Sequence, residues 1–180
     1  DYPGNIFWLV QKEFSALERQ GTLLALVSRN NLDDVDEVLH NHPDMVLKES
    51  QIVAKKVNWD DKPSNLRVLA KELNVGLDSF VFLDDSPFEC DAVRQQLPMV
   101  KVVRVPDTLS EYPKVVAEIK SLFLAGGSSA ESIGKTEQYR QRAVTEDLKA
   151  QFETQEEYLA SLELKVELTR NARASAGRIS

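Results

Sequence analysis

The sequence predicts an α/β fold in which a Rossmann-like parallel sheet carries helices on both faces. Short apolar runs alternate with amphipathic, helix-length segments through the first 125 residues. This alternation is typical of strands that helices bury from both sides. The composition, 42% apolar and 28% charged over 180 residues, suits one globular domain with a fragment of a second.

The individual elements follow from periodicity and from capping residues. Pro63 and Pro87 stand in first helical turns, where a missing N–H costs nothing, and Asn31 is a candidate cap. The run at 45–47 is a weaker strand candidate. Helices are expected over residues 5–20, 32–42, 63–74, 87–97 and 111–124, and strands over 22–28, 79–85 and 100–105.

Two further segments are expected after the first domain. All seven prolines lie at or before Pro113, and the small residues of 125–134 read as a linker. The domain therefore covers 1–125, and a linker with helices covers 126–160. The alternating pattern of 161–168 marks 161–180 as the start of a second domain.

Charge and cysteine content narrow the function classes. A net charge of −7 and a pI of about 5.0 argue against nucleic acid as a partner. The single cysteine, Cys90, cannot form an internal disulfide, which favours a cytoplasmic location. We expect no membrane partner, because no apolar run approaches about 20 residues. The start lacks both Met and a signal peptide, as in a piece of a longer protein.

Polar residues gather where predicted strands end or helices begin, which is where open parallel sheets bind ligands. Asp84 and Asp85 suit Mg²⁺, or else form a solvated turn before a helix. Ser28 can hold a phosphate, or else belongs to a simple turn and cap. Lys62 can neutralise phosphate charge, or else is a solvated lysine.

The order of these residues resembles motifs two, three and four of the haloacid dehalogenase (HAD) superfamily. Longer matching segments are SRNN (28–31), HPDMVL (42–47), NWDDKPSNL (58–66), ELNVGLDSFVFLDDSPFE (72–89) and VRQQLP (93–98). Through these segments, most of residues 1–125 resembles the FkbH-like branch of the superfamily more closely. The remainder resembles that family's lead-in to an acyltransferase-like domain.

The resemblance implies a role for each matching residue. Ser28 would bind phosphate, and Lys62 would steady the charge of the nucleophile and phosphoryl group rather than serve folding. Asp84 would ligate Mg²⁺ directly, with Asp85 beside it in the metal shell. Asn30 and Asn31 would line the substrate side, although the resemblance supports these two assignments less strongly.

The superfamily's nucleophilic aspartate, in a DxDxT-type motif ending the first strand, has no counterpart before Ser28. Residues 33–36 contain three aspartates, but they follow motif two and lie in a helix pattern. We therefore expect a HAD-like sheet that is incomplete at its N-terminus. We also expect the 180-residue chain to be inactive alone.

The FkbH-like resemblance implies an enzyme that dephosphorylates a glyceryl donor, 1,3-bisphosphoglycerate, and passes the glyceryl group to an acyl carrier protein. Its cofactor would be Mg²⁺, and its partners a phosphorylated acyl donor and the carrier. Two alternatives stay open. One is a HAD phosphatase acting on a small phosphate ester, and the other is a non-catalytic fragment or binding module.

Several other conspicuous residues receive structural interpretations. His40 and His42 suit polar roles at a helix end better than a zinc site, because no cysteine lies nearby. Trp8 is expected in the core, and Trp59 either shapes the pocket or does not contribute. Cys90 is expected to be a buried or neutral thiol, because nothing near it would lower its pKa.

Overall fold

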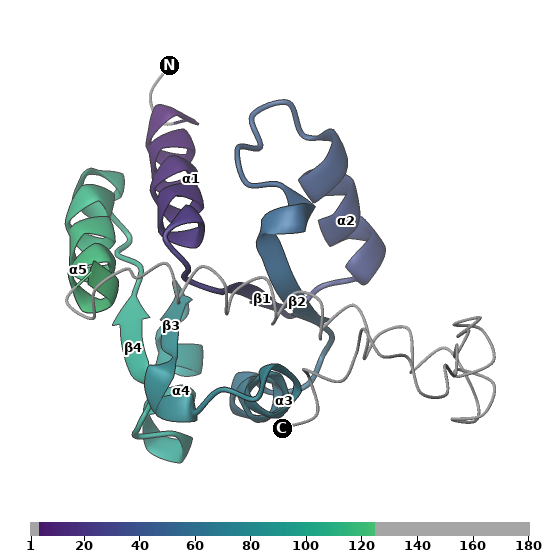
Figure 1. Cartoon of the computed structure of the whole chain (residues 1–180), viewed down its shortest axis with the longest axis vertical. Helices are drawn as coiled ribbons and strands as arrows, with labels where there is room; N and C mark the ends of the chain where they lie inside the picture. The colour runs from purple at the N-terminus through teal and green to yellow at the C-terminus, as the bar shows by residue number, and fades with distance from the viewer. Residues whose placement is uncertain (1–3, 125–180) are drawn as a thin grey trace, which may run out of the picture. The chain divides into compact units, whose positions relative to one another are not determined.

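The computed structural model describes residues 4–124, and the segments expected over 126–160 and 161–180 lie outside them. Helices and strands alternate along this part of the chain, as expected (Figure 1). In order, the elements are α1 (Gly4–Arg19), β1 (Leu24–Ser28), α2 (Leu32–Asn41), β2 (Ile52–Val57), α3 (Lys62–Leu73), β3 (Val81–Asp84), α4 (Pro87–Gln96), β4 (Lys101–Arg104) and α5 (Tyr112–Leu124).

The strands form two parallel pairs rather than one continuous sheet. β1 pairs with β2, with Ser28 opposite Val57, and β3 pairs with β4, with Asp84 opposite Arg104. Within the described residues no ladder joins β1 to β3. The predicted parallel strands are therefore present, and their division into two pairs agrees with the incomplete sheet expected from the sequence.

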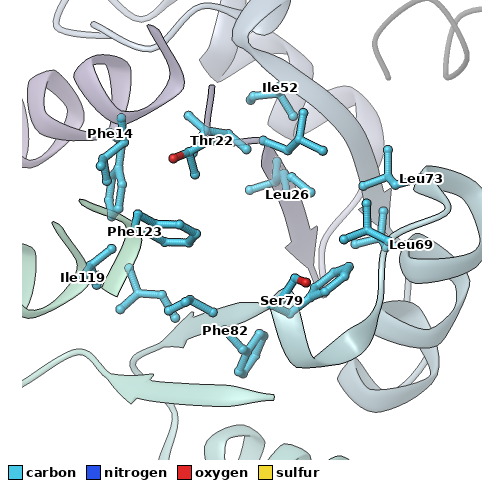
Figure 2. Close-up of a pocket in the computed structure, with 18 of the residues that line it drawn as sticks. Phe14, Thr22, Leu26, Ile52, Leu69, Leu73, Ser79, Phe82, Ile119 and Phe123 are labelled. Carbon is cyan, nitrogen blue, oxygen red and sulfur yellow. The ribbon is translucent and has the colours of Figure 1, made fainter. Parts of the chain in front are cut away.

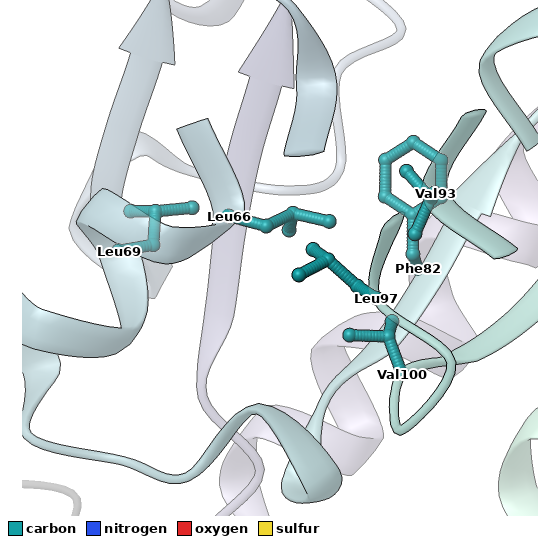
Figure 3. Packing of buried hydrophobic residues seen from close by; sticks show 6 residues of the cluster. All are labelled: Leu66, Leu69, Phe82, Val93, Leu97 and Val100. Carbon is teal, nitrogen blue, oxygen red and sulfur yellow. The ribbon is translucent and has the colours of Figure 1, made fainter. Parts of the chain in front are cut away.

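Helices cover both faces of the β3–β4 pair. On one face, Phe82 packs with side chains of α3 and α4, as Figure 3 shows. On the other face, Val103 packs with Leu17 of α1 and Ile119 of α5. Alternate residues of one strand thus enter different cores, which explains why these strands read as continuous apolar runs. The first core contains Leu66, Leu69, Phe82, Val93, Leu97 and Val100.

The prediction for the second strand was wrong. Residues 45–47 are irregular, and the backbone N–H groups of Val46 and Leu47 donate to Gln11 Oε1 at 2.8 and 3.2 Å. The strand is instead β2, which was not predicted because Lys55 and Lys56 interrupt its apolar run. Lys55 Nζ bonds Asp36 Oδ1 at 2.6 Å and so lies against α2 instead of in water.

The prolines expected in first helical turns stand there in α3 and α4, whereas the side-chain cap expected from Asn31 is not formed. Asp61 caps α3 by accepting from Ser64 N at 2.9 Å, and Ser86 caps α4. Asn31 occupies the N-cap of α2, but its side chain donates to Asp34 instead of accepting from the backbone. Of the helices in residues 4–124, none is both long and apolar enough to cross a membrane.

A cavity of about 560 Å³ lies among β1, β3 and the helices that flank them (Figure 2). Its lining is mostly apolar, and Figure 2 shows Phe14, Leu26, Phe82 and Phe123 around it. None of the predicted site residues lines it. Further contributors include Leu17, Ala25, Val27, Leu69, Val81, Leu83 and Ile119.

The backbone edges that face away from β2 and β4 also border this cavity. Ser28 O accepts from Asn58 N, so the backbone groups of Ser28 and of alternate residues before it bond to β2. The backbone N–H and C=O groups of Val27 therefore point away from β2. By the same alternation, Asp84 O accepts from Val105 N, so Leu83 points away from β4. Both strands therefore direct N–H and C=O groups from an edge that carries no strand in the described part of the chain.

Candidate active site

Three predicted site residues meet at the carboxyl ends of the strands. Ser28 is the last residue of β1, and Asp84 is the last residue of β3. Lys62 is the first residue of α3, which follows β2 and packs against β1. The expectation that Lys62 precedes the helix is therefore corrected by one residue.

Lys62 joins the two strand pairs. Its ammonium donates to Val27 O, next to Ser28, at 2.6 Å and lies 3.6 Å from Asp84 Oδ2. The residue is only 6% exposed, so the interpretation of Lys62 as a solvated lysine is wrong. A buried ammonium held by a carbonyl and a carboxylate is fixed in position next to Ser28, at the carboxyl end of β1.

Asp84 and Asp85 differ in their surroundings. Asp84 Oδ1 accepts from Ser86 N at 2.9 Å, and the side chain is 13% exposed, whereas Asp85 is exposed. In residues 4–124 no group of three or more His, Cys, Asp or Glu side chains is arranged to hold a metal ion. Mg²⁺ commonly takes one or two carboxylates and completes its shell with waters and substrate phosphate, so two carboxylates suit it.

The loop between β2 and Lys62 is held by hydrogen bonds of residues that were not predicted to belong to the site. Asn58 and Asn65 exchange side-chain amide hydrogen bonds of 3.0 and 2.9 Å, and Asn58 Oδ1 also accepts from Asp60 N. Asp61 is the N-cap of α3, and the hydrogen bond that it accepts from Ser64 N lowers the pKa of its carboxyl below the ordinary value. Helical periodicity could not reveal the pair of asparagines, because Asn58 lies in the loop before α3 and Asn65 lies within the helix.

A second ion pair links the same strand ends and was also missed. Arg29 Nη1 lies 2.9 Å from Glu89 Oε1, and Arg29 Nε donates to Asp60 O at 3.4 Å. The Glu89 side chain is 9% exposed, and its Oε2 is buried without a hydrogen-bond partner. Arg29 and Glu89 are far apart in sequence, so only the fold brings them together.

The structure does not bring every predicted residue into this group. Asn30 Oδ1 accepts from Asn31 N, and Asn31 Nδ2 donates to Asp34, so both side chains make local contacts. Both residues are exposed. Trp59 is 71% exposed, and no described contact shows it shaping a pocket.

Other conspicuous residues are structural. Burial raises the pKa of the Cys90 thiol, whose Sγ donates to Asp84 O, so the neutral thiol expected there is confirmed. His40 bonds Asp36 O and Glu49 near the end of α2, as expected. Trp8 was expected in the core, but it is 38% exposed and lies beneath the Lys12 ammonium at 4.1 Å.

Comparison with known proteins identifies one informative likeness. No family model matches the chain, and no curated protein matches it. A solved structure, the N-terminal part of the protein BF1531 from Bacteroides fragilis containing a phosphatase domain complexed with Mg, is 36% identical with a TM-score of 0.60. The likeness covers 62% of this chain and 30% of that one.

This likeness confirms the α/β class with short parallel strands and supports a HAD-like phosphatase fold. The chain spans less than a third of the length of the structure that it matches.

Proposed function

We propose that this chain is the phosphate- and magnesium-binding part of a HAD-type phosphatase. The observation that carries the proposal is the buried Lys62 ammonium, bonded to Val27 O beside Ser28 and paired with Asp84. A fixed cation at the carboxyl edge of parallel strands suits a phosphoryl group, whose negative charge it would offset. The likeness to a phosphatase domain complexed with Mg supports the same reading.

Asp84 and Asp85 are the residues that would hold Mg²⁺. Asp84 Oδ2 has Lys62 at 3.6 Å as its nearest described partner, while Oδ1 is oriented by Ser86 N. When bound, Mg²⁺ would neutralise phosphate charge. The chain's own groups would do the rest: Ser28 would donate its hydroxyl to a phosphate oxygen, and Lys62 would stay fixed as charge develops.

The nucleophilic aspartate of such a phosphatase is not among the predicted strand ends of this sequence. We propose that it lies on a further strand, which would pair with the free edges of β1 and β3 and fill the cavity between them. The cavity of about 560 Å³ has a mostly apolar lining, and apolar surface left against water loses the stabilisation that burial would bring. An apolar occupant such as a further strand is therefore favoured.

A finer proposal follows from the FkbH-like sequence resemblance. The whole protein would remove phosphate from 1,3-bisphosphoglycerate and pass its glyceryl group to an acyl carrier protein. The segments that support this reading lie around Ser28, Lys62 and Asp84. Copurification of the protein with an acyl carrier protein, and loading of that carrier detected by mass spectrometry, would test it.

The phosphatase proposal is tested by phosphate release from acetyl phosphate with and without Mg²⁺. A longer protein carrying an Asp-x-Asp strand ahead of Tyr2 should be active, and the 180-residue chain should be inactive. In the longer protein, Lys62→Met should lower turnover about 100-fold or more. The matched control, Lys56→Met, removes a surface ammonium paired with Glu72 and should leave turnover unchanged.

Two outcomes would contradict the proposal. Robust phosphatase activity of the 180-residue chain alone, lost in Lys62→Met, would show that the nucleophile lies within it. Absence of activity in the longer protein, together with no binding of Mg²⁺ or phosphate by calorimetry, would favour the second candidate, a non-catalytic binding module. The absence of a DxDxT-type motif from this sequence is the observation behind that candidate.

A further inference from the structure

We propose that Arg29 and Glu89 are positioning residues. Their ion pair would fix the position of the phosphate-binding part of the site, at Ser28, relative to its metal-binding part, at Asp84 and Asp85. This inference rests on the proposed function. Arg29 follows Ser28 at the end of β1, and Glu89 lies in the first turn of α4, which follows Asp84 and Asp85. The 2.9 Å pair therefore connects the segment that carries Ser28 with the segment that carries the two carboxylates.

The fold makes such a connection necessary. β1 and β3 share no backbone hydrogen bonds in the described residues, so a ladder does not fix the relative positions of their carboxyl ends. Helices α3 and α4 pack together through apolar side chains of the core, and Arg67 on α3 donates to Gln96 O at the end of α4, away from the carboxyl ends of the strands. At the strand ends, the described ion pairs between the two halves are Lys62–Asp84 and Arg29–Glu89.

The chemistry of the pair suits a fixed connection. Arg29 also donates Nε to Asp60 O, so a single guanidinium on the segment after β1 contacts the segments after β2 and β3. A planar guanidinium with several fixed donors holds such geometry better than a flexible ammonium. Lysine at this position would keep the charge and lose the simultaneous contact with Asp60 O and Glu89.

Burial makes the two residues interdependent. The Glu89 side chain is 9% exposed, and its Oε2 is buried without a hydrogen-bond partner. Among the described residues, Arg29 is the cation that offsets the negative charge of this carboxylate. Removing Arg29 alone would leave a buried, uncompensated charge, which costs more than removing both partners. The variant Arg29→Met should thus be less stable than the double variant Arg29→Met/Glu89→Leu.

A coupling measurement distinguishes positioning from simple stabilisation. The affinity of the full chain for inorganic phosphate would be measured by calorimetry, without Mg²⁺ and at saturating Mg²⁺. In the unmodified chain Mg²⁺ should tighten phosphate binding. The coupling ratio is the phosphate affinity at saturating Mg²⁺ divided by the affinity without Mg²⁺. Arg29→Met should reduce this ratio about fivefold or more, because a coupling free energy depends on the relative positions of the two sites. Arg29→Lys should not restore it.

The matched control is Arg94→Met. Arg94 forms an ion pair of the same 2.9 Å length with Asp91, but both residues belong to α4 and the pair is exposed. This control should leave the coupling ratio unchanged. A ratio that falls equally in both variants, or in neither, would overturn the proposal.

A second measurement needs neither phosphate nor metal. Spin labels at Val38→Cys, on α2 between β1 and β2, and at Met99→Cys, in the turn between α4 and β4, report the distance between the two β–α–β units. Both positions are exposed, while buried Cys90 stays unlabelled. Arg29→Met should broaden the distance distribution, and Arg94→Met should not. An unchanged distribution refutes the inference. Absence of phosphate and Mg²⁺ binding in the unmodified chain instead refutes the proposed function, and the distance measurement still decides the role of the pair.

Discussion

Replacing Lys62 with Met removes a buried ammonium but keeps a side chain of similar length. The lost hydrogen bond to Val27 O, at 2.6 Å, involves a charged donor and contributes about 1.5–3 kcal/mol. The attraction to Asp84 at 3.6 Å is about 5 kcal/mol at an effective dielectric constant of about 20. Desolvation of the ammonium opposes this attraction by several kcal/mol. The expected net loss in the free energy of unfolding is about 2 kcal/mol.

The measurement is urea unfolding followed by circular dichroism, with thermal unfolding as a check. A loss of about 2 kcal/mol should lower Tm by about 4–8 °C in a chain of this length. Lys56→Met is the control, because its pair with Glu72 is at the surface and should contribute less than about 1 kcal/mol. A loss below about 0.5 kcal/mol in Lys62→Met would refute the reasoning and return Lys62 to the role of a solvated side chain.

Three further predictions concern residues around the site. Asp61→Ala should cost about 1 kcal/mol in unfolding experiments through loss of the α3 cap, whereas Asp61→Asn should keep the cap. Because hydrogen bonding lowers the pKa of Asp61 from 3.8, its contribution should be complete at neutral pH and lost as pH falls below that value, and Asp61→Asn should lack this part of the acid titration. Cys90 should react with a disulfide reagent at pH 8 only as fast as the chain opens, because it is fully buried with a raised pKa; fast labelling of native protein would contradict this. Asp84→Asn should weaken Mg²⁺ binding measured by calorimetry, and an unchanged affinity would show that Asp84 is not a ligand.

The sequence predicted those elements whose signals are local. Pro87 marks the start of α4, and the apolar run before Asp84 marks β3, so both boundaries agree with the structure within a few residues. β2 escaped prediction because Lys55 and Lys56 interrupt its apolar pattern. Their partners Asp36 and Glu72 belong to other elements, so the compensation for their charge becomes visible only in three dimensions.

The same distinction holds for the site. Ser28, Lys62 and Asp84 were predicted because each stands at the end of a strand or the start of a helix, and the topology of parallel strands gathers such positions. The pairing of Arg29 with Glu89 could not be predicted, because it depends on how two separately hydrogen-bonded strand pairs are placed. The expectation that Lys62 has no part in folding is replaced for a similar reason, since its burial arises from the packing of α3 against β1.

The division into two strand pairs has a consequence for folding kinetics. β1–α2–β2 and β3–α4–β4 are each built from consecutive segments, so each unit can form mainly through contacts of short sequence separation. The Lys62–Asp84 and Arg29–Glu89 contacts form only when the units dock, and substitutions there should speed unfolding more than they slow folding. The edge that we propose to bind ligands would then form last and open first. Bound phosphate and Mg²⁺ would slow that opening, so the lifetime of the folded chain would lengthen as their concentrations rise.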